Sequence, residues 1–161
     1  MLIEMSIKGL MMDPLTNMPI VLLRDPESER VLPIWVGPVE ANAIMLQVEN
    51  VAPPRPMTHD LLRQVLTELG ATLTRVIIAD LHDNTFFAYL ELKRGGGEVL
   101  FLDARPSDAL ALSIRTRAPV FVDTKVLDQA KTVEVTSEQA DRERLQRWLE
   151  SLDPDDLGYK M

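Results

Sequence analysis

Three short segments of the sequence carry polar side chains of the kinds that catalyse reactions or bind anions. The first ends in Glu40, the second spans residues 55–60, and the third spans residues 103–108. Each coincides with a predicted helix start, where main-chain N–H groups lack partners and attract phosphate. Arginine offers paired donors to phosphate oxygens, carboxylates bind divalent cations, and histidine transfers protons near neutral pH. Such a set of side chains suits the hydrolysis of a phosphate ester.

The same residues also have a structural interpretation. Side chains at helix starts often cap the helix or pair with a nearby arginine, and this applies to Thr58, Asp60, Ser107, Asp108, Arg55 and Arg105. Trp35 stands in an apolar run and is expected in the core. The sequence has no P-loop, dinucleotide fingerprint, zinc pattern or nucleophile elbow that would decide between the two interpretations.

The hydrophobic pattern predicts the elements that position these segments. Short apolar runs between turn residues predict strands at 2–12, 19–24, 30–36, 71–80, 85–93, 98–103 and 119–122. Helical spacing and start signals predict helices that begin at Pro38 and Pro106, a helix over 58–69 capped by Thr58, and one or two helical turns over 125–130. A last helix is predicted over 137–152 with Ser137 as its cap; it either docks on its own chain or packs on a neighbouring subunit.

The two halves of the chain repeat one pattern at a constant offset of 68 residues, as from Pro38 to Pro106. Both helix starts read Pro-x-acid-Ala-x-Ala-aliphatic, so Glu40 and Asp108 occupy equivalent positions. We therefore predict an α+β single domain of two pseudo-repeated three-strand-plus-helix units, which form a mixed or antiparallel sheet core, plus a C-terminal helix.

Composition limits the function classes. The 161 residues fit one domain, and no apolar run approaches the roughly 18 residues needed to span a bilayer, so we expect a soluble, cytoplasmic chain without membrane contact. Because there is no cysteine, disulfides, thiolate nucleophiles and Cys-ligated zinc are excluded. The formal net charge of -8 repels polyanions, so any nucleic acid would be held weakly and locally.

The three polar segments together resemble the bifunctional nuclease (BFN) domain family. The motifs that carry the resemblance are Leu-Pro-Ile-Trp-Val-Gly at 32–37 with Glu40, Arg-Pro-Met-Thr-His-Asp-Leu-Leu at 55–62, and Asp-Ala-Arg-Pro-Ser-Asp-Ala-Leu-Ala-Leu at 103–112. The resemblance implies an α+β domain over residues 1–135 and nuclease activity on both RNA and DNA. Residues 136–161 are then a C-terminal helical appendage.

From the resemblance and the residue chemistry we predict a metal-assisted phosphodiesterase. The predicted catalytic residues are Glu40, His59, Asp60 and Asp108, with His59 relaying a proton. The predicted substrate-binding residues are Arg55, Arg105 and Ser107. Glu40, Asp103 and Asp108 are predicted to bind Mg or Mn.

Two other interpretations remain open. The same residues fit a non-enzymatic module that binds an anion, a nucleotide or a protein, and they also fit caps and salt bridges that only specify the fold. We expect a homo-oligomer, because the first strand, with Met11 and Met12, and the helix that carries Trp148 both offer apolar surface. The enzymatic interpretation requires the separated acids and arginines to meet in one solvent-accessible pocket that is large enough to admit a phosphate.

Overall fold

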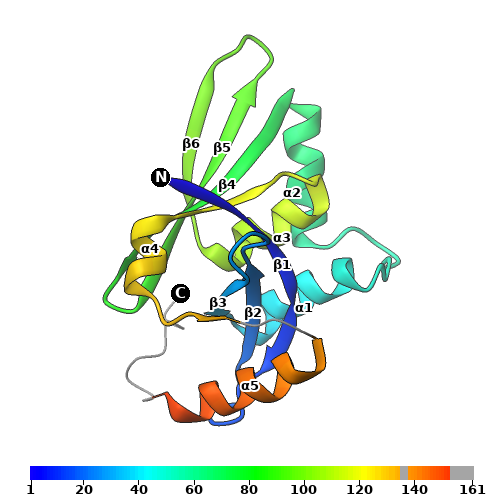
Figure 1. Ribbon diagram of the computed structural model, residues 1–161. Helices are drawn as coiled ribbons and strands as arrows, with labels where there is room; N and C mark the ends of the chain where they lie inside the picture. The colour runs from blue at the N-terminus through cyan, green and yellow to red at the C-terminus, as the bar shows by residue number, and fades with distance from the viewer. Residues whose placement is uncertain (135–137, 153–161) are drawn as a thin grey trace.

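Two copies of a three-stranded meander followed by a helix form most of the chain. The computed structural model describes residues 1–134 and 138–152. The first copy consists of β1 (Leu2–Met12), β2 (Pro19–Arg24), β3 (Arg30–Trp35) and α1 (Pro38–Val48). The second consists of β4 (Ala71–His82), β5 (Thr85–Arg94), β6 (Val99–Ala104) and α3 (Pro106–Thr116), and α2 (Thr58–Glu68) connects the copies (Figure 1).

One mixed sheet joins the two copies. The strand order is β6-β5-β4-β7-β1-β2-β3-β8, where β7 is Val120–Asp123 and β8 is Val133–Glu134. Strand β7 pairs in parallel with β4 and antiparallel with β1, so it bridges the two meanders. This arrangement confirms the predicted α+β class and mixed sheet.

The predicted duplication is also confirmed. Helices α1 and α3 begin and end 68 residues apart, and their N-cap residues, Gly37 and Arg105, share an extended backbone with φ of -68° and -66°. A proline at the first helical position follows each cap, where its missing N–H costs no hydrogen bond. Equivalent local sequences therefore form equivalent strand-to-helix junctions.

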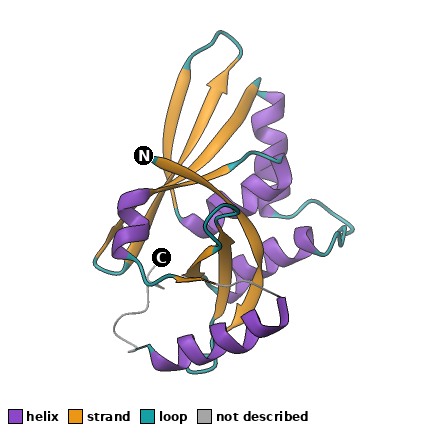
Figure 2. Cartoon of the chain, viewed as in Figure 1, coloured by secondary structure: helices purple, strands orange, loops and turns teal. Residues whose placement is uncertain are grey.

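Helices cover the sheet on both sides. The main core joins the strands to α1 and α3 through buried aliphatic residues such as Ile34, Ile44 and Leu110. On the other side, α5 (Glu138–Ser151) packs Leu145 and Leu149 onto a patch of β2 and β3. Figure 2 shows this helix where it crosses the end of the first meander. The prediction that this helix docks on its own chain is confirmed, and its predicted cap Ser137 lies outside the described residues.

Helix α2 departs from the prediction at its start. Its N-cap is Met57, and the Asp60 carboxylate accepts a hydrogen bond from the Met57 N–H at 2.9 Å, so the prediction that Thr58 caps the helix is wrong. Gly70 follows its end with φ of 73°, a conformation that glycine adopts without strain. The short α4 (Thr124–Gln129) follows β7. In the described part of the chain, no helix is long and apolar enough to cross a membrane.

Candidate active site

The equivalent starts of α1 and α3 bring two acids together that are 68 residues apart in the sequence. Glu40 and Asp108 each stand in the first turn of their helix, and both bind the guanidinium of Arg105. Arg105 donates from Nε to Asp108 Oδ2 at 2.9 Å and from Nη2 to Asp108 Oδ1 at 3.2 Å. The same Nη2 lies 3.1 Å from Glu40 Oε1. One arginine therefore links the two halves of the duplicated fold.

The Arg105 guanidinium remains accessible despite these contacts. Its side chain is 47% exposed, and its Nη1 donates no hydrogen bond to any residue that the structure describes. The hydrogen bond to Asp108 raises the pKa of Arg105 above its ordinary value, and the bond to Glu40 adds to this, although burial opposes it. Arg105 is therefore a permanent cation with donor capacity left for an anion.

His59 approaches the same acid from a third element. It is the second residue of α2, and its Nε2 lies 3.0 Å from Asp108 Oδ1. Its side chain is 12% exposed. Because a carboxylate only accepts hydrogen bonds, the network assigns the Nε2 proton to this contact and leaves Nδ1 of the neutral ring as a proton acceptor. The pair has the arrangement of a base oriented by a carboxylate.

The surroundings keep Asp108 ionised. Burial acts to raise its pKa, but hydrogen bonds from Arg105 and His59 outweigh burial and hold the pKa below its usual range. The carboxylate binds side chains rather than the main-chain N–H groups of its helix, because α3 has no side-chain cap. Asp108 is therefore not a helix cap, while its pair with Arg105 fits the interpretation as a fold-specifying salt bridge as well as the enzymatic one.

A buried arginine holds α2, and with it His59, in place. The side chain of Arg115 is 3% exposed, and its Nε donates to Asp60 Oδ1 at 2.7 Å. Its Nη2 donates to the Ala43 carbonyl of α1 at 2.9 Å, so one guanidinium joins all three helices. Burial acts to raise the pKa of Asp60, but the Met57 N–H and Arg115 lower it overall. Asp60 was predicted to be catalytic; its contacts support a positioning role next to His59.

Gly37 makes room for Glu40. A Cβ atom at this position would overlap the Glu40 carboxylate, which folds back over the helix start. The backbone of Gly37 has φ of -68°, so the requirement is for space and not for an unusual conformation. Sequence reasoning identified Gly37 only as part of a helix start and did not single out Arg115. The close approach is visible only after folding.

Three other predicted site residues do not take part in the hydrogen bonds and ion pairs of this cluster in the described part of the chain. Arg55 is exposed in the loop before α2 and makes no contact that would tie it to the cluster among the described residues. Asp103 is exposed on β6, where it is in register with Tyr89 of β5. Ser107 is fully buried, and its Oγ has no hydrogen-bond partner in the described part of the chain. Their predicted roles stay predictions without support from this geometry.

The predicted metal ligands are not gathered into one cluster. Within residues 1–134 and 138–152, no group of three or more His, Cys, Asp or Glu side chains is placed to hold a metal ion. Glu40 and Asp108 share a guanidinium that a cation would have to displace, and Asp103 does not contact them. Carboxylates remain the ligand type that Mg and Mn use, so binding of these ions stays a prediction. We assign no chemical step to a metal.

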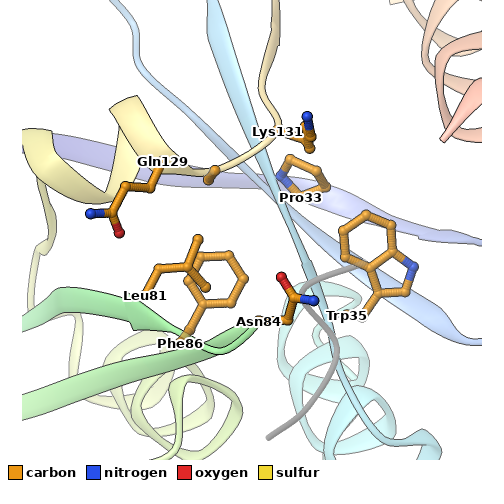
Figure 3. Close-up of a pocket in the computed structure, with 8 residues that line it drawn as sticks. Pro33, Trp35, Leu81, Asn84, Phe86, Gln129 and Lys131 are labelled. Carbon is orange, nitrogen blue, oxygen red and sulfur yellow. The ribbon is translucent and has the colours of Figure 1, made fainter. Parts of the chain in front are cut away.

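A separate pocket of about 210 Å³ lies between the two meanders. Figure 3 shows Trp35 and Phe86 in its wall, with the Asn84 amide between them and with Gln129 and Lys131 on the side of α4. Trp35 is buried, as expected, and its indole N–H donates to Asp13 Oδ2 at 2.8 Å. None of the residues that line this pocket belongs to the Arg105 cluster.

Comparisons with known proteins identify the family to which the chain is similar. A family model described as the bifunctional nuclease domain matches residues 21–135. An uncharacterized protein of Mycobacterium tuberculosis is 38% identical over 163 aligned residues, which cover 96% of this chain and 97% of that protein. Bifunctional nuclease 1 of Oryza sativa subsp. japonica is 26% identical over 109 residues, 66% of this chain and 33% of that protein.

Arabidopsis thaliana contains a similar relative. Its Bifunctional nuclease 1 is 28% identical over 105 residues, which cover 64% of this chain and 32% of that protein. The plant proteins are thus about three times as long as the region they share with this chain, whereas the mycobacterial protein matches along nearly its whole length. Since the family model covers well over half of the sequence, this chain belongs to the bifunctional nuclease domain family.

Proposed function

We propose that this protein is a nuclease that hydrolyses phosphodiester bonds of RNA and DNA at the cluster of Arg105, Asp108, His59 and Glu40. The single observation that carries the proposal is the convergence of these side chains from three helices, which leaves the Arg105 guanidinium half exposed beside a histidine. Family membership and the names of the plant relatives support the same activity. Separately from this activity, we propose a cytoplasmic location and a homo-oligomeric assembly.

Each residue has a role that follows from its contacts. Nη1 of Arg105 binds a phosphate oxygen of the substrate, while Glu40 and Asp108 fix the guanidinium plane. Nδ1 of His59 accepts a proton from the attacking water, and Asp108 stabilises the imidazolium that forms. The water oxygen bonds to phosphorus, the bond from phosphorus to the leaving sugar oxygen breaks, and the imidazolium returns its proton to that oxygen.

The acidic surface limits how tightly the substrate binds. With a formal net charge of -8, the protein repels a polyanion at long range, so the local cation Arg105 provides the attraction. We therefore expect weak binding that engages few phosphates. A shallow dependence of the Michaelis constant on salt concentration follows from such a small contact.

The test compares the two histidines of the chain. His59→Asn removes the proton acceptor, whereas His82→Asn changes a histidine at the exposed end of β4 and serves as the matched control. On single-stranded RNA and DNA, we expect kcat to fall by about 10²–10⁴-fold for His59→Asn and to stay unchanged for His82→Asn. Parallel assays with EDTA test the predicted metal. Full activity of both His59→Asn and Asp108→Asn would show that this cluster is not the active site.

One observation favours the alternative of a non-enzymatic binding module. The charge of Arg105 is already compensated by two carboxylates, which weakens its attraction for a phosphate in a reaction but still permits reversible anion binding. This alternative predicts saturable binding of a mononucleotide in calorimetry, with loss of binding in Arg105→Gln, and no turnover by carefully purified protein. Turnover that depends on His59 contradicts it.

A further inference from the structure

Strand β6 is an edge strand with exposed apolar side chains on both faces. Among the described residues it pairs only with β5, and it lies at the border of the sheet in Figure 1. Phe101 is 57% exposed, and Val99 and Leu102 are about half exposed. Side chains alternate along a strand, so Val99 and Phe101 lie on one face and Leu102 on the other. Such an edge is a template for pairing with a further strand.

The duplicated fold shows how the equivalent edge is covered in the first half. Strand β3 pairs with β8, and α5 packs on its outer face. Pro33 stands 68 residues before Phe101 and removes one N–H from the β3 ladder. Strand β6 has no such proline, strand or helix in the part of the chain that the structure describes. The second half therefore exposes a strand edge whose equivalent in the first half is covered by β8 and α5.

We propose that β6 pairs antiparallel with β6 of a second copy of this chain, so that one continuous sheet runs through a two-fold symmetric dimer. Two identical strands that pair antiparallel satisfy each other's main-chain N–H and C=O groups. The assembly therefore closes at two subunits and leaves no free β6 edge. This proposal goes beyond the nuclease function and does not depend on it.

The main-chain hydrogen bonds specify a register. The Glu98 carbonyl accepts a hydrogen bond from the Arg94 N–H at 2.9 Å, so Glu98 faces β5. Because successive residues of a strand face opposite neighbours, the main-chain groups of Val99, Phe101 and Asp103 face the free edge. A pair centred on Phe101 places it opposite the partner's Phe101 and places Val99 opposite the partner's Asp103. In this register all three residues exchange hydrogen bonds with the second copy.

Charge complementarity favours the same register and a second copy as the occupant. Lys93 of β5 is in register with Val99, and Val99 would pair with the partner's Asp103. The lysine and the partner's aspartate would therefore flank Val99 in one row, on the same face of the sheet, with opposite charges. The charged side chains at this edge are Glu91, Lys93, Arg94, Glu98 and Asp103. Glu91 is paired with Arg75 of β4, and the other four balance each other although the whole chain carries a formal charge of -8. An edge with balanced charge favours neither a polyanion nor a strongly cationic partner.

A single introduced thiol tests the register directly, because the chain has no cysteine. In Phe101→Cys, the two thiols of a dimer face each other, so a short bismaleimide should cross-link most of the protein into dimers. Val99→Cys is the matched control on the same strand and face: each thiol would lie opposite the partner's Asp103, and cross-linking should be minor. Failure of Phe101→Cys to cross-link, or equal cross-linking of both variants, contradicts the proposed pairing.

Sedimentation of the full chain tests the dimer itself. We expect the wild type to be a dimer, Phe101→Glu to be a monomer, and Leu15→Glu, which changes an exposed leucine in the β1–β2 turn, to remain a dimer. Lys93→Asp and Asp103→Lys should each raise the dimer Kd by about tenfold, and the double variant should recover the wild-type value. Circular dichroism verifies that each variant folds. A wild type that is monomeric at every concentration, or a double variant that is weaker than both single variants, overturns the proposal.

Discussion

The three polar segments of the sequence meet at the pair of Arg105 and Asp108, where Glu40 binds Arg105 and His59 binds Asp108. The sequence indicated that Glu40, His59, Arg105 and Asp108 carry chemistry, and the fold places them in one network. The types and positions of Arg55 and Asp103 likewise indicated that they carry chemistry, yet both lie apart from the network. Proximity to a helix start is readable from sequence, whereas the direction of a side chain in a loop or at a strand edge depends on neighbours that are distant in the chain.

At the residue scale, the space at Gly37 determines where Glu40 lies. Gly37→Ala introduces a methyl group where the Glu40 carboxylate now folds back, and the flexible carboxylate is the group that moves. The φ of -68° suits alanine, so the free energy of unfolding should stay within about 1 kcal/mol of the wild type. We expect kcat/KM on single-stranded RNA to fall by about 10–100-fold, because Arg105 loses one of the two acids that orient it.

A double-variant cycle distinguishes this mechanism from a general disturbance of α1. If Gly37→Ala acts through Glu40, it should have little further effect on kcat/KM in a chain that already carries Glu40→Gln. Ala41→Gly, one residue further along the same helix, is the structural control: it should lower stability and leave the Glu40 contact intact. Additive losses from Gly37→Ala and Glu40→Gln would contradict the positioning role of Gly37.

At the element scale, the helix starts were predictable and the contacts between helices were not. Pro38 and Pro106 indicate the starts of α1 and α3, because within a helix proline fits only the first turn without loss of a hydrogen bond. Arg115 gave no comparable signal, since a basic residue in the last turn of a helix is ordinary. Its importance comes from the Ala43 carbonyl and the Asp60 carboxylate, which belong to α1 and α2 and reach it only in the folded chain.

We expect Arg115→Met to destabilise the protein by about 3 kcal/mol, since it leaves the buried Ala43 carbonyl and the partly exposed Asp60 carboxylate without their donor. Urea denaturation measures this change. Arg94→Met is the control, because it breaks an exposed pair with Glu98, where the loss should stay below about 1 kcal/mol. Because α2 carries His59, nuclease activity should fall in Arg115→Met even where the protein remains folded. Equal stability losses in the two variants would argue against a joining role for Arg115.

At the scale of the whole molecule, the internal duplication was the most informative feature of the sequence. It predicted the two meanders and the equivalence of Glu40 and Asp108 from the shared Pro-x-acid-Ala pattern. It did not predict that β7 joins the meanders, because a four-residue strand after the second unit has the same pattern wherever it pairs. The two units also differ at their outer edges, where only the first is covered by β8 and α5.

The pH dependence of folding follows from carboxylates that tie distant parts of the chain together. Asp108 and Asp60 link α2 to α3, Asp13 binds Trp35, and all three have pKa values below the ordinary 3.8. A carboxyl with a lowered pKa in the folded state contributes stability that is fully present above the unfolded value and is lost as pH falls through the folded value. We therefore expect the free energy of unfolding to be steady near neutral pH and to decrease below about pH 4.

The variant Asp108→Asn isolates the contribution of the site from that of the other acids. Near neutral pH it should be less stable than the wild type, because an amide keeps the shape of the carboxyl but loses its charge toward Arg105 and His59. As pH falls below 3.8, protonation removes the same charge from the wild type, so the difference between the two proteins should shrink. Urea denaturation of both proteins from neutral pH to about pH 3 measures this difference directly. A difference that stays constant over the whole range would mean that the Asp108 charge does not hold the three segments together.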